Sequence, residues 1–152
     1  MPDNLQGKPS PNGVWVSVSL HELTPDRAQR ICRQLLDLHD WSSYFTGANR
    51  VAFRYDYQQG EHSRAARTIS LLKQAGVTDR AITTFDIWRT TLRLSQSLSE
   101  EQATSLSTDL KRMLQVFNVT ITADAILHVE FRGEPATGAL RQVRRLVKRH
   151  TT

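Results

Sequence analysis

Hydrophobic and polar residues alternate along three stretches of the chain, a pattern typical of half-buried β-strands. The stretches run from about residues 13 to 20, 50 to 57 and 124 to 132. The positions expected to face a core are Val14, Val16, Val18 and Leu20; Val51, Phe53 and Tyr55; and Leu127, Val129 and Phe131. We therefore predict three strands, each with one buried face.

A fourth strand-like stretch, residues 82–94, changes phase in its middle. Phe85 and Ile87 share one side, whereas Trp88, Thr90 and Leu92 share the other. A phase change at period two indicates a bulge, or a tight turn between two short strands. No Gly, Asn or Pro lies at that point, which disfavours a tight hairpin. The pattern does not decide between one bent strand and a hairpin.

Apolar residues at helical spacing predict four helices, over about residues 23–41, 63–76, 98–118 and 138–150. Thr24 is a candidate N-cap for the first helix, followed by Pro25 at the first helical position. Ser99 and Gln102 form a predicted capping box at the start of the third helix.

Strands and helices alternate, which predicts an α+β fold with helices on one face of a sheet of four to five strands. Residues 50–132 supply the order of a ferredoxin-like split β-α-β core if the phase change is a turn. Otherwise a duplicated β-α-β-α unit, with an internal repeat of 13–77 and 82–150, is the alternative. We expect residues 1–12 to be a flexible arm and 13–152 a single α+β domain.

The 152-residue chain is basic, with a net charge of +5 and a pI near 9.9. Its one cysteine, Cys32, excludes an internal disulfide and a Cys-based zinc site. The sequence contains no dinucleotide-binding GxGxxG, Walker loop, HExxH, EF-hand loop or GxSxG elbow. With no run of eighteen apolar residues, we expect a cytoplasmic protein that makes no contact with a membrane.

Basic residues gather near the C-terminus and at helical spacing elsewhere. The first group is Arg141, Arg144, Arg145, Lys148 and Arg149; the smaller groups are Arg27, Arg30 and Arg33, and Arg64 and Arg67. In the C-terminal helix a neighbouring apolar stripe is expected to dock on the core. Like charges at this spacing repel, so we interpret the groups as phosphate contacts. A solvated charged face is the alternative.

Asp56 is the candidate catalytic residue. A carboxylate at a strand end beside a glycine-containing turn could hold a divalent cation, and two such acids in a symmetric dimer could bind Mg²⁺. The structural alternative is that Asp56 caps the turn or pairs with Arg54 or Arg64. His128 and Glu130 are expected, with Arg132, on the open face of the sheet, solvated or paired.

Four consecutive segments, RVAFRYDY, RAARTISLLKQAG, TTFDIW and LSEEQATSLSTDLKRML, resemble the small CRISPR adaptation nuclease-like subunit and the VapD ribonucleases. The resemblance covers about residues 50–117. In that family the acid after the aromatic residue is the proposed metal ligand, so the resemblance implies that role for Asp56 only. The family's core strand opens the chain, whereas here about fifty residues precede it.

These observations lead to one main hypothesis and two alternatives. The main one is a non-enzymatic accessory protein of a mobile element or defence system, without a cofactor, that grips DNA or RNA phosphates. A sheet with an open face and free edges also predicts a homodimer. The alternatives are a Mg²⁺-dependent nuclease that uses Asp56, and an adaptor or immunity protein with an acidic protein partner.

Overall fold

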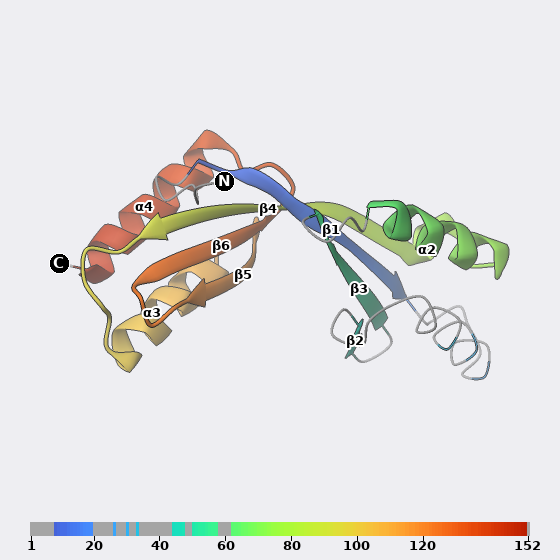
Figure 1. The fold of residues 1–152 in the computed structure, drawn as a ribbon, viewed down its shortest axis with the longest axis horizontal. Coiled ribbons are helices and arrows are strands. Elements are labelled where there is room, and N and C mark those ends of the chain that lie inside the picture. Colours follow the sequence, from blue (N-terminus) through green and yellow to red (C-terminus); the bar gives the residue numbers. More distant parts are fainter. Residues whose placement is uncertain are drawn as a thin grey trace. The chain divides into compact units, whose positions relative to one another are not determined.

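The computed structural model describes residues 8–19, 26, 30, 33, 44–47, 50–57 and 62–151. The elements are β1 (Ser10–Ser19), β2 (Tyr44–Gly47), β3 (Arg50–Asp56), α2 (His62–Gln74), the 3₁₀ helix η3 (Asp79–Ala81), β4 (Ile82–Arg93), α3 (Glu100–Lys111), β5 (Val116–Ile121), β6 (Ile126–Arg132) and α4 (Thr137–Thr151) (Figure 1). Asp26, Arg30 and Arg33 are helical. The other residues of the helix predicted over 23–41, Thr24 and Cys32 among them, lie outside the described residues.

The chain divides into two compact units that begin with the same order of elements. The first unit is Asn12–Asp86, and the second unit is Ile87–Thr152 with Met1–Pro11. The strand order is β2-β3-β1-β4-β6-β5, so β1 and β4 each contribute residues to both units. The first unit has the ferredoxin-like order β-α-β-β-α-β, and the second unit contains the first five elements of that order, as β4, α3, β5, β6 and α4. The predicted ferredoxin-like α+β fold is confirmed.

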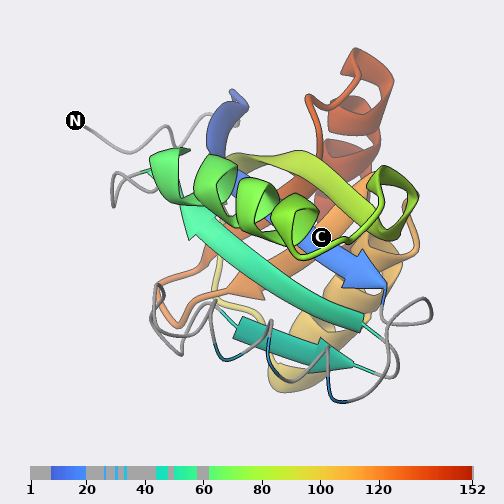
Figure 2. The same cartoon turned by 90° about the vertical axis from the view of Figure 1, so that its right-hand side faces the viewer.

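The core of the first unit lies between α2 and the strands that α2 crosses (Figure 2). The predicted alternation holds in β1 and β3, where Val16 and Phe53 are paired across the two strands and completely buried. Tyr55 is also buried, and its hydroxyl forms a hydrogen bond with Thr68 of α2. This bond satisfies two buried polar groups and joins the helix to the sheet.

Gly13 lies at a close approach between the backbones of β1 and β3. It lies opposite Asp56 in the antiparallel register, and a Cβ atom at this position would be 2.3 Å from the carbonyl oxygen of Tyr55. No side chain fits at that distance unless the two strands separate. Glycine is therefore required here for the backbone pairing at the end of β3.

The core of the second unit joins α3 and α4 to one face of β4, β5 and β6 (Figure 1). Leu106 and Leu110 of α3, together with Val143 and Leu146 of α4, pack in the cluster that contains the inward residues of β6. The predicted capping box is confirmed, because Ser99 and Gln102 exchange both hydrogen bonds at the start of α3.

The predicted length of the third helix is wrong. The helix ends at Lys111, and residues 116–121, expected to be partly helical, form β5. Pairing of β5 with β6 shifts register between Val116 and Asn118, which marks a bulge. A bulge moves one residue to the opposite face and so hides the period-two alternation of a strand. The strand β2 likewise lies in a stretch without clear alternation.

The phase change near Trp88 is not a turn, because β4 is one continuous strand, and the pairing of β4 with β6 shows no register shift between Ile87 and Arg93. Ile82 packs against the core of the first unit, and Trp88 and Leu92, at the same parity, pack against the core of the second unit. Phe85 is at the opposite parity and stacks on Trp15 of β1 with 6.3 Å between ring centroids. Near the boundary between the two units, β4 therefore has apolar residues on both of its faces. In the sequence this looks like a change of phase in the period-two pattern.

The topology also corrects the resemblance to the CRISPR subunit and VapD. Residues 50–117 do not form one folding unit: β3, α2 and the start of β4 belong to the first unit, whereas α3 belongs to the second unit. In addition, β3 pairs antiparallel with β1, a strand that precedes it in the chain. The resemblance followed the local pattern of elements, which does not specify the pairing of strands.

We expect Gly13→Ala to destabilise the protein by about 1–3 kcal/mol, because the new methyl group overlaps the backbone of β3. Gly138→Ala is the matched control, since a Cβ at Gly138 meets no atom within 4 Å and lies in the first turn of α4. The control is expected to be neutral or stabilising by up to about 1 kcal/mol. Urea unfolding measures both, and equal stabilities of the two variants would contradict the close approach.

Candidate functional site

The helix-free face of the second unit carries a set of polar side chains at paired positions. The register places Arg89 of β4 opposite Glu130 of β6, and Glu130 opposite Asn118 of β5. The next row on the same face contains Thr91, His128 and Thr120. We call these six residues the polar face. The intervening positions of β6, Leu127, Val129 and Phe131, belong to the core on the other side of the sheet.

Glu130 is the unusual member of the polar face, because its side chain is ionisable and the residue is only 5% exposed. The amide of Asn118 donates a hydrogen bond to the carboxyl group of Glu130 over 3.3 Å. Burial of a carboxyl group is costly unless polar groups compensate it. The sheet therefore retains a polar group at a position where an apolar side chain would be simpler to accommodate.

His128 is held by a second polar contact on the same face. The distance between its Nδ1 atom and the hydroxyl oxygen of Thr91 is 3.0 Å, and Thr91 is 9% exposed. The imidazole tautomer determines which of the two groups donates. The contact fixes the orientation of the ring on the sheet and leaves Nε2 as its second polar atom.

The polar face combines the groups that recognise small polar molecules. A carboxylate pairs with an ammonium group, a guanidinium pairs with a carboxylate, and hydroxyl, amide and imidazole groups supply directional hydrogen bonds. Alternation in the sequence predicts His128 and Glu130 on the open face but gives no sign of Asn118 and Thr120, whose segment has no alternating pattern. The bulge in β5 removed the alternation that would have indicated them.

Arg132 has a different environment from the one expected on the open face. Its guanidinium donates hydrogen bonds to the carbonyl oxygens of Leu114 and Val116, each over 3.2 Å. It also lies 5.6 Å from the centroid of the Phe117 ring. Arg132 therefore stabilises the start of β5 and is not part of the polar face.

Asp56 lies at the end of β3, where its carboxylate accepts a hydrogen bond from Nε of Arg54 over 3.0 Å. This pairing matches the structural alternative for Asp56. Within the described ranges no group of three or more His, Cys, Asp or Glu side chains is arranged to hold a metal ion. Next to Asp56, the Tyr57 hydroxyl donates to Asp86 over 3.3 Å.

The pKa of Tyr57 is raised above its ordinary value. Burial is the largest cause, followed by repulsion between the Asp86 carboxylate and a phenolate, and then by the hydrogen bond to Asp86. Ionisation of Tyr57 is therefore less favourable in the folded protein than in the unfolded chain, so the neutral phenol contributes to stability relative to the phenolate. That contribution is complete below the ordinary tyrosine pKa of about 10 and is lost as the pH rises through the value in the folded protein.

The basic residues singled out in the sequence are divided between the two units. Arg141, Arg144, Arg145, Lys148 and Arg149 are exposed on α4, in the second unit. In the first unit Arg67 is exposed on α2, and Arg30 and Arg33 are exposed at isolated helical positions. Arg27 and the side chain of Arg64 lie outside the described part of the structure. The C-terminal group and the smaller groups therefore belong to different units.

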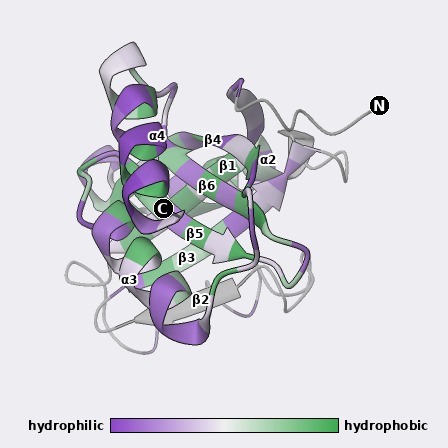
Figure 3. Cartoon of the chain, turned by 90° about the vertical axis from the view of Figure 1, so that its left-hand side faces the viewer, coloured by the Kyte–Doolittle hydropathy of each residue, from purple (hydrophilic) through white to green (hydrophobic). Residues whose placement is uncertain are grey.

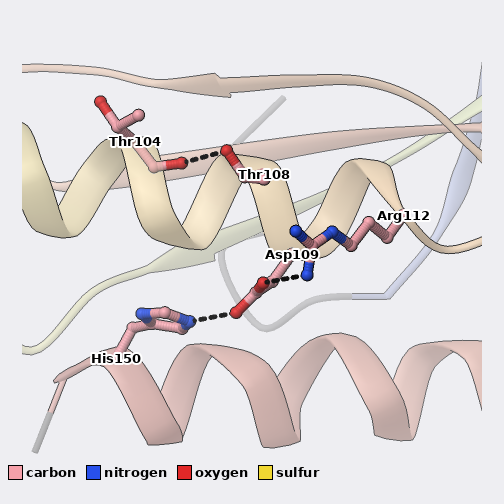
Figure 4. A network of polar contacts seen from close by, with 5 residues as sticks. All are labelled: Thr104, Thr108, Asp109, Arg112 and His150. Atoms are coloured by element: carbon pink, nitrogen blue, oxygen red, sulfur yellow. Dashed lines mark hydrogen bonds and ion pairs between the residues drawn. The ribbon is translucent and has the colours of Figure 1, made fainter.

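The two helices of the second unit are joined by a polar contact near the end of α4 (Figure 4). His150 Nε2 lies 2.7 Å from Asp109 of α3, and the other carboxylate oxygen of Asp109 lies 3.6 Å from Arg112. The side chain of Gln96 donates to the carbonyl oxygen of Thr151. These contacts hold the C-terminal turn of α4 in place.

In the described part of the chain no helix is long and apolar enough to cross a membrane.

Comparison with known proteins finds similarity at the level of solved structures. No family model and no curated protein matches the chain. The regulatory subunit of aspartate kinase from Thermus thermophilus is 15% identical, with a TM-score of 0.48, over 95% of this chain and 98% of that one. Aspartokinase III from E. coli, solved with lysine and aspartate, is 12% identical, with a TM-score of 0.47, over 95% of this chain and 32% of that one.

The N-terminal extension of CzcP from Cupriavidus metallidurans is 16% identical, with a TM-score of 0.33, over 85% of this chain and 92% of that one. At identities this low, the similarities concern the fold. Neither the CRISPR adaptation subunit nor VapD is among these structures, so the resemblance inferred from the sequence is wrong in this respect as well.

These findings overturn the functional interpretation of the basic residues. The similar structures reported above include regulatory domains of aspartate kinases. The hypothesis of a DNA- or RNA-binding accessory protein is therefore corrected, and the nuclease and adaptor alternatives are withdrawn with it. The expected homodimer is not supported either. The sheet has six strands, in the order β2-β3-β1-β4-β6-β5, whereas four to five were expected.

We expect Asp86→Asn to lower the pKa of Tyr57 toward its ordinary value, because the substitution removes the negative charge beside the phenol. Ultraviolet absorbance of the phenolate, recorded during an alkaline titration, measures the change, and Tyr57→Phe identifies the contribution of this residue. Asp79→Asn is the matched control, since Asp79 is exposed and paired with Lys73. Identical titration curves for Asp86→Asn and the unmodified protein would contradict the assignment.

Proposed function

We propose that the chain is a non-catalytic regulatory module that binds a small polar molecule at the polar face of the second unit. The observation that carries the proposal is the buried Glu130, bonded to Asn118 on a sheet face that the core does not use. Buried ionisable groups that the fold does not require gather at functional sites more often than elsewhere. The proposal needs no cofactor.

The chemistry of the polar face favours a zwitterionic ligand of amino-acid size. Glu130 supplies an acceptor for an ammonium group, and Arg89, its cross-strand neighbour, supplies a donor pair for a carboxylate. Asn118 and the Thr91–His128 pair would recognise the remaining polar groups of the ligand through directional hydrogen bonds. Lysine and aspartate, which are bound in the E. coli aspartokinase III structure, are the first candidates to test.

A structural change caused by the ligand could reach the first unit through the backbone of β4. Arg89 and Thr91 belong to β4, and the same strand begins at Ile82 in the first unit. A ligand that shifts or stiffens the second half of β4 therefore acts on a strand that the first unit also uses. Coupling of this kind requires only that the ligand binds one arrangement of the strand better than another.

We expect a panel of amino acids to include at least one that raises the melting temperature of the protein and gives a saturable signal in isothermal titration calorimetry. Glu130→Gln is expected to weaken that binding by about 10- to 100-fold, because it removes a charge-assisted hydrogen bond worth roughly 1.5–3 kcal/mol. Glu134→Gln makes the same chemical change at an exposed position outside the polar face and should bind normally.

Two results would count against the proposal. One is a panel in which no compound binds the unmodified protein. The other is a ligand that binds Glu130→Gln and the unmodified protein equally well. Circular dichroism of both variants separates a loss of binding from a loss of folding.

A further inference from the structure

The exposed side of α4 is an unusually concentrated positive surface. The helix contains Arg141, Arg144, Arg145, Lys148 and Arg149, and no Asp or Glu occurs between Thr137 and Thr151. We call these five residues the basic stripe. All five are exposed. The attraction between cations and a helix C-terminus accounts for Lys148 and Arg149, which lie in the last turn, but not for the three arginines before them.

The helix is fixed so that the basic stripe faces away from the core. Val143 and Leu146 are buried in the core of the second unit, and Leu140 and Val147 pack against the same cluster. At 3.6 residues per turn, these positions fall on the side of the helix opposite the cations. Hydrophilic and hydrophobic residues accordingly occupy different sides of α4 (Figure 3). The contact between His150 and Asp109 also holds the end of the helix against α3.

The cations of the basic stripe lie close to one another along α4. Arg141 is followed by Arg144 and Arg145 at the third and fourth positions, and both are followed by Lys148 within one turn. Like charges at these spacings repel. An exposed surface with charges of one sign attracts a partner of the opposite charge, and the positions of these residues on α4 require no rearrangement to meet it.

The shape of the stripe favours a broad partner over a compact one. The five cations extend over about 12 Å of a convex helix. A small anion on such a surface contacts two or three of them at once and stays exposed to water. A flat, negatively charged surface meets all five together. The apolar side of α4 is already occupied by the core, so contact does not depend on insertion of the helix.

We propose that the basic stripe of α4 docks on the surface of an anionic phospholipid membrane. The phosphates and carboxylates of acidic headgroups are the complementary charges, and each arginine or lysine near such a surface adds about 1 kcal/mol of attraction, which is about a fivefold gain in partitioning. This inference is independent of the ligand proposed for the polar face. It replaces the sequence-based expectation of no membrane contact, which considered spanning helices only.

The experiment measures sedimentation of the full chain with vesicles of phosphatidylcholine alone and of phosphatidylcholine mixed with phosphatidylserine. We expect binding to the mixed vesicles only, with reversal by high salt. The triple variant Arg141→Gln, Arg144→Gln, Arg145→Gln should lose on the order of 100-fold in partitioning. Its melting temperature should be unchanged or higher, because repulsion within the helix is relieved.

The matched control is the triple variant Arg67→Gln, Lys73→Gln, Arg80→Gln, which removes the same charge from exposed positions of the first unit. This control should retain binding. An equal loss in both triple variants would show that only net charge matters and would overturn the proposal. Failure of the unmodified protein to bind mixed vesicles at low salt would also overturn the proposal. Binding that persists at high salt would overturn it too, because persistence indicates insertion of apolar residues into the membrane.

Discussion

The continuity of β4 is the constraint on which the rest of the structure depends. A single strand, Ile82–Arg93, supplies one strand to each of two ferredoxin-like units. Its side chains must therefore satisfy two cores in succession, with Ile82 in one and Trp88 and Leu92 in the other. The strand β1 is also divided between the two units, since Ser10 and Pro11 belong to the second unit and the rest of β1 to the first unit.

This arrangement gives the second unit two surfaces of different character. The helix side carries α3 and α4, and α4 presents the basic stripe to solvent. The helix-free side carries the polar face, in which Glu130 and His128 are held by neighbours on adjacent strands. A small ligand on one side and a charged partner on the other would act on the same three strands. Under the proposed function, a change in those strands would reach the first unit through β4, which has residues in both units.

Local sequence pattern predicted the elements that satisfy local rules. Alternation located β1, β3 and β6, and the Ser99–Gln102 spacing located the start of α3. The pattern failed where tertiary context decides: a bulge hid β5, and apolar residues on both faces of β4 imitated a turn. For the site, alternation placed His128 and Glu130 on the open face. Their partners Thr91 and Asn118 follow from strand register, which depends on contacts distant in sequence.

Amide hydrogen exchange along β4 tests the central claim most directly, because exchange rates report whether backbone hydrogen bonds are continuous. If β4 is one strand shared by both units, the amides of β4 that form hydrogen bonds in the sheet should exchange slowly throughout. Slow exchange should continue through Asp86, Ile87 and Trp88 without a gap. Rapid exchange confined to these three residues would show a turn between two short strands. That result would contradict the shared strand and the coupling between the two units that depends on it.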